Sequence, residues 1–397
     1  MNGLRLTVRG VFAASAICLV APGSTDSAFA GEAPLPVVQA PFDSDYQVQD
    51  LGAVPGVPVG YAGIAFLAGD PNTLLVGGHQ GRSDAAVYSV SVTRDGSGHI
   101  TGFGGPADGF AQYYADAPYI DGGLVYGPGG VLFYTRNHIG ASEIGEIKPG
   151  SNTTDHVADL AGAGMAMSPG GLNFVPDDFP TGAAGSMKAT SYSDGDWFDL
   201  VLAALGDGTF DVISASKRAD LQPGMEGFSF VPPGSPIFGD TLRWTLINEF
   251  NNEIIGAYEL DVNGDPTGPR QVFMTDAGGP EGSVFDPITA DLIVTDWAND
   301  RLYQVTGFTP APMTPTPTLT PTPTPTPTPV KPLGDVNDDG AVNSIDALLI
   351  LQFDADLLSS IVNLDSGDVN LNGRINAIDA ALILQLEAGL IPGLPPG

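Results

Sequence analysis

The sequence predicts a mainly β chain that ends in a small α-helical module, and three observations lead to this fold class. Residues 31–308 alternate short apolar segments with glycine-rich turns, and no long amphipathic helix interrupts them. Residues 309–332 are almost entirely threonine and proline. Residues 333–397 hold two copies of one acidic loop, each followed by an apolar run of helical character. The chain therefore divides into a β domain, a linker and a helical domain.

An export signal precedes these parts. Arg5 and Arg9 supply a positive start, residues 11–21 form an apolar stretch, and Ala28-Phe29-Ala30 fits a cleavage site of the A-x-A type. We expect residues 1–30 to be a signal peptide that is removed. This predicts a secreted, extracellular protein and leaves its attachment to the cell surface open.

The alternative for the first stretch is a membrane anchor, which needs about 20 consecutive apolar residues. Pro22 and Gly23 interrupt the run well before that length, and no later segment is both long and apolar enough to span a bilayer. We therefore expect no membrane span after cleavage. Cys18 is the sole cysteine and lies within the signal, so the mature chain can form no disulfide.

The charge of the chain narrows its partners. It carries 14 basic and 46 acidic side chains, a formal net charge of −32 at pH 7. Such a surface repels the phosphates of nucleic acid and of anionic membranes, so neither is expected as a partner. Because 43% of the residues are hydrophobic, the charge belongs to a folded protein rather than to an acidic disordered chain. Metal cations are the natural counter-charge.

Tight turns join the predicted strands of residues 31–308. Asp95-Gly96, Asp207-Gly208 and Asn263-Gly264 each stand between alternating apolar segments, which is the pattern of a β-hairpin. The strands are therefore expected to be antiparallel.

A degenerate repeat organises these strands. A glycine is followed three residues later by an aromatic residue at intervals of 48 to 60 residues, and a second strand follows most of the copies. The five copies are Gly63-x-x-Phe66, Gly123-x-x-Tyr126, Gly171-x-x-Phe174, Gly227-x-x-Phe230 and Gly282-x-x-Phe285. Units of this length predict a β-propeller of about five or six blades, with a β-sandwich as the alternative.

One segment of this domain also resembles known propellers. The stretch "GPEGSVFDPITADLIVTDWANDRLYQVTGF", residues 279–308, is similar to the last blade of propellers in secreted bacterial proteins with sorting tails. More loosely, it resembles the gluconolactonase-like and NHL-type propellers. The resemblance covers these 30 residues well and the rest of the domain only in outline.

The Thr/Pro-rich linker, residues 309–332, has no periodic apolar pattern. Alternating proline favours an extended polyproline helix of about 3.1 Å per residue, so the segment predicts a semi-rigid spacer of up to roughly 70 Å.

Two loops after the linker predict calcium sites. "GDVNDDGAVNSIDALLILQ" and "GDVNLNGRINAIDAALILQ" are offset by 33 residues, and each puts oxygen-bearing side chains at positions 1, 3, 5, 9 and 12 of a twelve-residue loop. A hard cation such as Ca²⁺ takes six to eight oxygen ligands from a loop of this spacing, including a main-chain carbonyl at position 7. The predicted ligands are Asp335, Asn337, Asp339, Ala341, Asn343 and Asp346 in the first loop, and Asp368, Asn370, Asn372, Arg374, Asn376 and Asp379 in the second.

The remaining loop positions fit this interpretation. Gly340 and Gly373 at position 6 permit the sharp bend, and Val342 and Ile375 at position 8 are expected to point inward and pair the loops. Helices are expected to begin near residues 344 and 377. The second loop has two ligand carboxylates against three in the first, so we expect the first site to bind calcium more tightly.

Two loop–helix repeats with aspartate at position 12, where a helix–loop–helix EF-hand has glutamate, resemble the type I dockerin family. The resemblance covers nearly all of residues 334–390. It implies two calcium ions, folding coupled to metal, and docking to a cohesin-like domain of a scaffold or cell-surface protein. The chain departs from the cellulosomal pattern at positions 10 and 11, where Ser344-Ile345 and Ala377-Ile378 replace a Ser-Thr-like pair. In that family, partner choice is read at these two positions.

Catalytic residues are harder to find in residues 31–308. The mature chain has no cysteine and no G-x-S-x-G motif, which speaks against a serine or cysteine hydrolase. Asp121, Glu226 and Glu281 stand just before repeat glycines and would converge near a propeller axis, where they could hold a metal or a sugar. The alternative is that these acids cap strand ends or face solvent.

Gluconolactonase-like propellers hold a catalytic metal at the axis with acidic and amide side chains. That resemblance implies that Asn137, Asn248 or Asn299 joins the acids. The three tryptophans of the domain are expected to serve the core more than a sugar platform; they are Trp197, Trp244 and Trp297.

Three functional hypotheses follow. In the first, the helical domain docks the protein to a cohesin-type partner while the propeller binds a carbohydrate or protein ligand. In the second, the propeller is an extracellular polysaccharide-degrading hydrolase of the glycosidase type, because dockerins are usually appended to such enzymes. In the third, the module is a calcium-stabilised tail without a partner. The first leads, because no complete catalytic constellation can be named.

Overall fold

The computed structural model describes residues 34–104, 110–138, 140–166, 168–179, 183–239, 243–310, 332–355, 357–358 and 360–395. The predicted signal peptide and nearly all of the Thr/Pro linker lie outside these residues. The chain forms two compact units, Met1–Pro312 and Met313–Gly397. No helix in the described ranges is long and apolar enough to cross a membrane.

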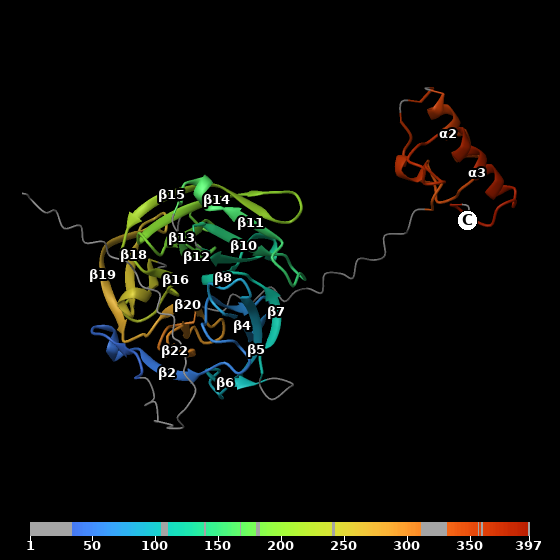
Figure 1. The fold of residues 1–397 in the computed structure, drawn as a ribbon. Helices are drawn as coiled ribbons and strands as arrows, with labels where there is room; N and C mark the ends of the chain where they lie inside the picture. The colour runs from blue at the N-terminus through green and yellow to red at the C-terminus, as the bar shows by residue number, and fades with distance from the viewer. Residues whose placement is uncertain are drawn as a thin grey trace, which may run out of the picture. The chain divides into compact units, whose positions relative to one another are not determined.

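The described strands of the first unit form five antiparallel sheets arranged around a centre (Figure 1). The first three sheets, each from its innermost strand outward, are β3 (Ile64–Leu67), β4 (Asp70–Gly78), β5 (Ala86–Arg94) and β6 (Ile100–Gly104); β8 (Ile120–Tyr126), β9 (Leu132–Arg136), β10 (Glu143–Ile147) and β11 (His156–Asp159); and β12 (Pro169–Phe174), β13 (Met187–Ser191), β14 (Asp196–Ala204) and β15 (Phe210–Asp220). Strand β7 (Gln112–Asp116) pairs with β5 at the edge of the first sheet.

The last two sheets each take a strand from the N-terminus. In the same order they are β16 (Met225–Phe230), β17 (Trp244–Glu249), β18 (Ile254–Leu260), β19 (Pro266–Thr275) and β1 (Val37–Val38); and β20 (Pro280–Phe285), β21 (Leu292–Asp296), β22 (Arg301–Thr306) and β2 (Gln47–Gly52). Because β2 pairs with β22, the two ends of the domain close the ring within one sheet. The short helices between strands are η1 (Phe42–Ser44), η2 (Pro128–Gly130), α1 (Leu160–Ala163) and η3 (Phe250–Asn252).

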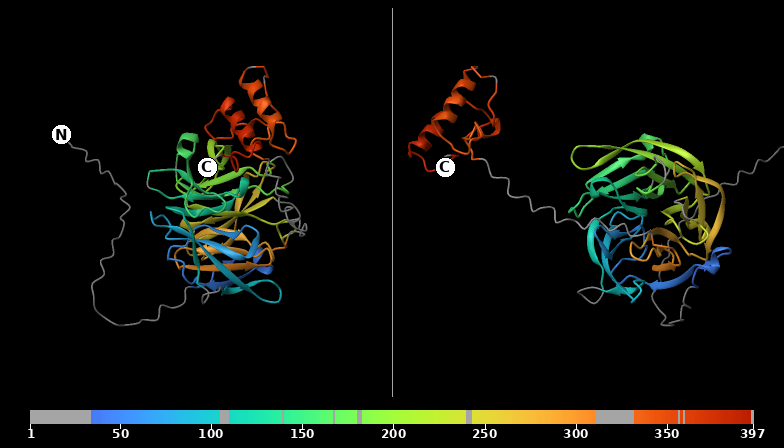
Figure 2. Two further views of the ribbon diagram at one scale, coloured as in Figure 1. Left: turned by 90° about the vertical axis from the view of Figure 1, so that its right-hand side faces the viewer. Right: turned by 180° about the vertical axis from the view of Figure 1, so that it is seen from behind.

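This architecture is a five-bladed β-propeller, so the predicted fold class is confirmed, the blade number is five, and the sandwich alternative is wrong. The ring of sheets is also seen from behind (Figure 2). Each copy of the repeat lies at an innermost strand, and its glycine lets neighbouring strands approach closely. A Cβ on Gly63 would lie 2.7 Å from the Cβ of Leu124, and one on Gly282 would lie 2.7 Å from the Cα of Gly63.

The predicted hairpin turns lie where the sequence puts them. The carboxylate of Asp95 accepts from the Ser97 backbone N–H at 2.8 Å between β5 and β6. Asp207 and Asp261 accept in the same way between β14 and β15 and between β18 and β19. An aspartate that binds the backbone two residues ahead fixes a tight turn, and a glycine further along each turn takes the positive φ, namely Gly98, Gly208 and Gly264.

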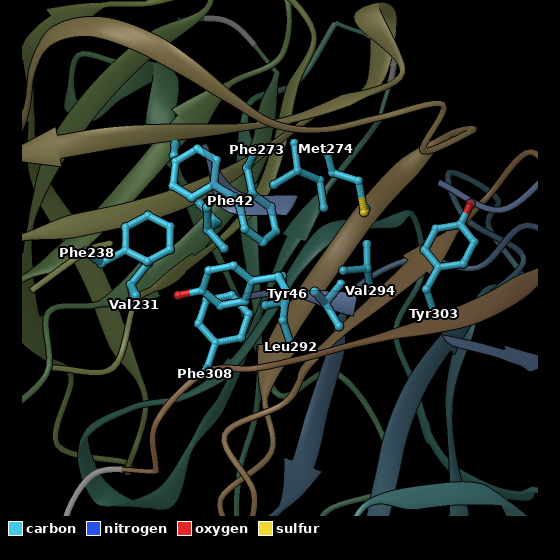
Figure 3. Packing of buried hydrophobic residues seen from close by; sticks show 14 of the residues in the cluster. Phe42, Tyr46, Val231, Phe238, Phe273, Met274, Leu292, Val294, Tyr303 and Phe308 are labelled. Carbon is cyan, nitrogen blue, oxygen red and sulfur yellow. The ribbon is translucent and has the colours of Figure 1, made fainter. Parts of the chain in front are cut away.

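Aromatic packing holds the closure of the ring together (Figure 3). Tyr46, near the start of the described chain, packs against Phe308 with ring centroids 4.5 Å apart. Phe42 stacks on Phe238 at 5.1 Å and meets Phe273 edge-on at 5.2 Å. This cluster buries residues from both ends of the domain. Aromatic packing and the β2–β22 pairing therefore both stabilise the closure of the ring.

The C-terminal unit consists of two helices, α2 (Ser344–Asp354) and α3 (Ala377–Glu387), each preceded by an acidic loop, and of η4 (Leu364–Ser366). Both helices begin where the sequence predicts. The backbone N–H of Ala377 donates to Asp354 at 3.0 Å, and Ser344 lies 3.5 Å from Glu387, so the start of each helix meets the end of the other.

The core of the unit repeats with the same 33-residue offset as the sequence. Six of the seven buried apolar residues of this cluster form three matched pairs, which are Val336 and Val369, Ala347 and Ala380, and Ile350 and Ile383. Val342 and Ile375 are partly buried against this cluster, as their predicted inward direction requires. The two loop–helix repeats therefore stabilise each other across one shared core.

Candidate metal centres

The first acidic loop is closed by its own carboxylates. Asp335, which is buried, accepts from the backbone N–H groups of Asp339 at 3.1 Å and of Gly340 at 2.9 Å. Asp346, also buried, accepts from Val336 and from Asn343, both at 3.0 Å. The two aspartates at the ends of the loop thus fix its backbone around a common centre.

The second loop repeats this geometry. Asp368 accepts from the backbone N–H groups of Asn372 at 3.0 Å and of Gly373 at 2.6 Å, and Asp379 accepts from Asn376 at 2.9 Å. Asp379 is buried and Asp368 is half-buried.

The other predicted ligands also hold the loops and helices in place. Asn343 and Asn376 cap α2 and α3, accepting from the backbone N–H groups two residues ahead. At positions 3 and 5 the acceptors are Asn337, Asp339, Asn370 and Asn372. Ala341 and Arg374 donate their backbone N–H groups to the side chains at position 5. Their carbonyl oxygens remain as the metal ligands expected at position 7.

This donor set fits a hard cation. Among the described residues no lysine, arginine or histidine forms an ion pair with Asp335, Asp346 or Asp379, although all three are buried. Burying charge without a counter-ion is costly, and an oxygen-ligated cation removes that cost.

The backbone adds a feature that the sequence analysis missed. Gly340 and Gly373 have the positive φ expected at position 6, but Asp338 and Leu371 at position 4 also have φ values of 62° and 56°. Aspartate tolerates this left-handed conformation and leucine does so only with strain. The second loop is therefore the more strained one.

A second candidate centre lies at the start of the innermost strands of the propeller. Asp121 on β8, Glu226 on β16 and Glu281 on β20 each offer a carboxylate oxygen, and these oxygens all lie within 4.8 Å of one another. All three side chains are at most 2% exposed. The predicted convergence at the axis is thus confirmed, and the alternative that these acids face solvent is wrong.

Irregular strand pairing produces this convergence. The register shifts between Ile120 and Leu124 on β8, and comparable shifts occur on β16 and β20 at the acids. Such bulges re-aim side chains. Gly122 leaves the space that the cluster needs, because a Cβ there would lie 2.7 Å from Oε2 of Glu226.

The electrostatics of the cluster are unbalanced. Gln80 donates to Oδ1 of Asp121, but Oδ2 of Asp121 and Oε2 of both glutamates have no hydrogen-bond partner among the described residues. Burial raises the pKa of Asp121 to about 7. Burial, and then the charges of the neighbouring acids, raise the pKa of Glu226 and Glu281 well above the usual range.

A family match covers the C-terminal unit. Residues 333–385 match the family model described as the dockerin type I domain. The C-terminal domain is a type I dockerin. Type I dockerins generally bind calcium and dock to cohesins. No curated protein matches the chain.

Solved structures similar to the chain cover each unit separately. A complex of a cohesin with a dockerin from Acetivibrio cellulolyticus, which displays a type I interaction, is 31% identical over 16% of this chain and 92% of that one, with a TM-score of 0.16. A gluconolactonase from Xanthomonas campestris is 14% identical over 69% of this chain and 95% of that one, with a TM-score of 0.39. A glucose dehydrogenase is 13% identical over 65% of this chain and 99% of that one, with a TM-score of 0.38.

The dockerin helices carry exposed apolar side chains. Ile345 and Leu348 on α2 are 54% and 52% exposed, and Ile378 on α3, which corresponds to Ile345, is 60% exposed. Leu351 and Leu384 form a further matched pair with exposures of 41% and 43%. Their spacing puts them on one stripe of each helix. We call these residues the apolar stripes.

Five blade residues that the sequence did not reveal as a set lie at the same end of the innermost strands as the axial acids. Each residue follows the second strand of its blade and donates its backbone N–H to the segment that leads into the first strand. The five residues are Gln80, Asn137, Tyr192, Phe250 and Trp297. We call this set the axial rim.

The rim residues correct the prediction for Trp297 and decide which of two predicted asparagines lies at the axis. Trp197 is buried as expected, but Trp297 is 41% exposed and is not a core residue, because it follows β21 at the strand end. Phe250 lies edge-on to Trp297 at 5.7 Å. Asn137 belongs to the rim, whereas Asn299 donates to Asp296 at 2.7 Å within the β21–β22 turn.

The opposite end of the axis has a different character. The five repeat aromatics line one cavity of about 340 Å³ there; they are Phe66, Tyr126, Phe174, Phe230 and Phe285. Because the acids stand at the beginnings of the innermost strands and the aromatics at their ends, one end of the axis is acidic and the other is apolar.

Proposed function

We propose that the protein is a secreted, modular component of an extracellular assembly. Its dockerin holds two calcium ions and docks to a cohesin-like domain of a scaffold or cell-surface protein, and its propeller is the displayed cargo. The proposed ligands are Asp335, Asn337, Asp339, Asn343 and Asp346 with the carbonyl of Ala341, and Asp368, Asn370, Asn372, Asn376 and Asp379 with the carbonyl of Arg374.

The observation that carries this proposal is the pair of apolar stripes. In each helix Ile350 or Ile383 already faces the shared core, so the stripes add nothing to the fold and leave apolar surface in water. Exposed apolar patches on small domains mark interaction surfaces. The stripes begin at position 11 of each loop, so calcium that orders the loops also fixes where the stripes stand.

The test is binding of the full chain to an immobilised type I cohesin, in calcium and in chelator. Charging both stripes, with Ile345→Asp and Ile378→Asp together, should weaken binding by roughly 30-fold or more, the loss expected from buried anchors. Val362→Asp is the control, because Val362 is 79% exposed in the same domain but lies on neither helix. Unchanged binding by the double variant, or failure of the wild type to bind any cohesin in calcium, would reject the docking role.

For the propeller we propose a carbohydrate ligand bound at the axial rim. Tyr192, Phe250 and Trp297 come from three neighbouring blades, and the ring of Phe250 is edge-on to both of the others. Aromatic side chains beside buried groups of perturbed pKa are the usual features of a ligand site. A protein ligand is the competing occupant.

A glycan-binding screen of the full chain tests this site. Trp297→Ala should lose at least about tenfold in affinity, because an exposed aromatic anchor is removed. Tyr126→Ala at the apolar end of the axis is the matched variant and should bind as the wild type does. If both variants lost the same affinity, or if only Tyr126→Ala lost affinity, the proposal that the ligand binds at the rim would be wrong.

The second candidate function is the hydrolase, and the axial acids are the observation that favours it. Two carboxylates across a glycosidic bond are sufficient for sugar hydrolysis. Turnover of a polysaccharide panel that is lost in Glu226→Gln would establish the enzyme, and binding without turnover would support the display protein.

A further inference from the structure

The second dockerin loop contains a dipeptide that the first loop does not have. Asn372-Gly373 stands at positions 5 and 6, where the first loop has Asp339-Gly340. Both residues of the dipeptide are exposed, so water reaches them. An asparagine before a glycine is prone to deamidation, because glycine has no side chain that would hinder attack by its own backbone nitrogen.

Deamidation at this position needs no reactant other than water. The backbone nitrogen of Gly373 attacks Cγ of Asn372, a carbon–nitrogen bond forms, and the side-chain amide leaves with the proton of that nitrogen as ammonia. The resulting succinimide ring takes up a water molecule, which opens the ring at either of its carbonyls. The products are aspartate and isoaspartate, and in isoaspartate the main chain runs through the side-chain carbons.

The closed loop restrains both reacting groups. The N–H of Gly373 donates to the carboxylate of Asp368 at 2.6 Å, and Oδ1 of Asn372 accepts from the backbone N–H of Arg374 at 2.9 Å. The same Oδ1 is the ligand expected at position 5. A cation in the loop therefore fixes Asn372 through its side-chain oxygen and Gly373 through Asp368, and attack on Cγ requires the loop to open.

The loop has reasons to open when no cation is bound. It buries the carboxylate of Asp379, and Leu371, directly before the dipeptide, has a strained φ of 56°. A buried charge without a counter-ion and a strained backbone both favour opening. Local opening of this kind frees the backbone and side chains of the segment that opens.

We propose that Asn372-Gly373 is a deamidation site that bound calcium protects, so that time spent without calcium leaves a covalent change in the second loop. This rests on the proposed function, in which the second loop holds a calcium ion. Isoaspartate lengthens the main chain by a carbon atom between positions 5 and 6, so the oxygens of the loop lose the spacing that calcium needs. The first loop is spared, because Asp339 has no amide to lose as ammonia.

The propeller supplies a matched dipeptide. Asn263-Gly264 is the other Asn-Gly pair of residues 31–397 and lies in the turn between β18 and β19. Asp261 accepts from the backbone N–H of Asn263 at 2.7 Å and from its side-chain amide at 3.1 Å. Gly264 is buried. Two paired strands hold this turn, so its deamidation should not depend on the dockerin ions.

The test is incubation of the full chain at mildly alkaline pH, in calcium or in chelator, followed by peptide mass spectrometry that resolves aspartate from isoaspartate. Deamidation at Asn372 should be at least about tenfold faster in chelator, because the loop then opens more often. The rate at Asn263 should be the same in both conditions. Equal rates at Asn372 with and without calcium, or the same acceleration at both asparagines, would overturn the proposal.

Calorimetric titration of calcium into the fresh chain separates this failure from a failure of the proposed function. A fresh chain that binds about two ions and shows equal rates at Asn372 would refute the protection alone. A fresh chain that binds no calcium would refute the calcium role of the loops, and the protection with it.

A second titration, after incubation in chelator and return to calcium, tests the consequence for the second site. The wild type should bind fewer ions than its fresh sample, by up to about one per chain. Asn372→Gln should match its own fresh sample, because the longer side chain does not readily form the five-membered ring. A wild type that is converted to isoaspartate at position 372 and still binds as many ions as before would show that the change does not disable the site, against the proposal.

Discussion

The dockerin loops and the axial cluster use the same chemistry and are built in opposite ways. In each loop the carboxylates belong to one twelve-residue segment and are satisfied by its own backbone N–H groups, as Asp335 is by Asp339 and Gly340. At the axis, acids from three blades meet with orphaned oxygens. The loops can therefore organise around an ion as they fold, whereas the axial acids are brought together by the propeller whether or not an ion is present.

The largest effect that separates the two centres is expected from calcium removal. Chelation should unfold α2 and α3, since folding of a small metal-binding domain is coupled to its ion, while the β signal of the propeller persists. Circular dichroism of the full chain, with helix and strand bands followed separately, measures this. If the helical signal did not change with chelator, the dockerin would fold without its ion, and the contrast with the axial cluster would be wrong.

The next effect concerns the space at the axis. Gly122→Ala puts a methyl group 2.7 Å from Oε2 of Glu226 and should destabilise the propeller by about 1–3 kcal/mol, the usual cost of overpacking. Gly96→Ala is the control, because nothing lies within 4 Å of its added Cβ and its φ is not positive. Urea unfolding followed by tryptophan fluorescence compares the two. Equal stability of both variants would mean that the cluster is loosely packed.

A smaller effect distinguishes the two loops. The first loop has Asp339 at position 5 where the second has Asn372. Asn372→Asp should tighten the weaker calcium site by about tenfold, and Asp339→Asn should weaken the stronger one, because ligand charge sets affinity. Stepwise calorimetric titration resolves the sites. The strained φ of Leu371 should also weaken calcium binding by the second loop, so Leu371→Asn should raise the affinity of that site. Equal stepwise affinities in the wild type would contradict the asymmetry.

The smallest expected effect is the pH dependence of stability at Asp291, a buried acid that is paired with His99. His99 lies 2.6 Å from buried Asp291, and this hydrogen bond, helped by the charges of Asp95 and Asp286, raises the pKa of His99. A raised histidine pKa adds stability below its unfolded value near 6.5, and that stability is lost as pH rises through the folded pKa. Because His99 is 37% exposed, screening limits the effect to under about 1 kcal/mol.

Chemical unfolding at pH 6 and pH 8 checks this pair. The wild type should lose more propeller stability over the interval than His99→Gln does, although Asp121 and Glu146, whose burial raises their pKa values to about 7, titrate in both proteins. The same loss in both proteins would show that the ion pair contributes nothing.

The sequence by itself determined the features that depend on residues close together in the chain. The dockerin loops, their capping asparagines and the starts of both helices follow from residues that are neighbours in the chain, so periodicity alone predicts them. The five Gly-x-x-aromatic copies likewise predicted the propeller, because each blade repeats one local unit.

The tertiary structure decided what depends on contacts between blades. Glu226 and Glu281 stand directly before their repeat glycines, but Asp121 stands one residue earlier and reaches the cluster through a shifted register on β8. The ring of Trp297 and its neighbours likewise forms only after five strand ends converge. Side chains that are more than 50 residues apart acquire a common environment through closure of the ring, and no local pattern encodes which of their oxygens remain without a partner.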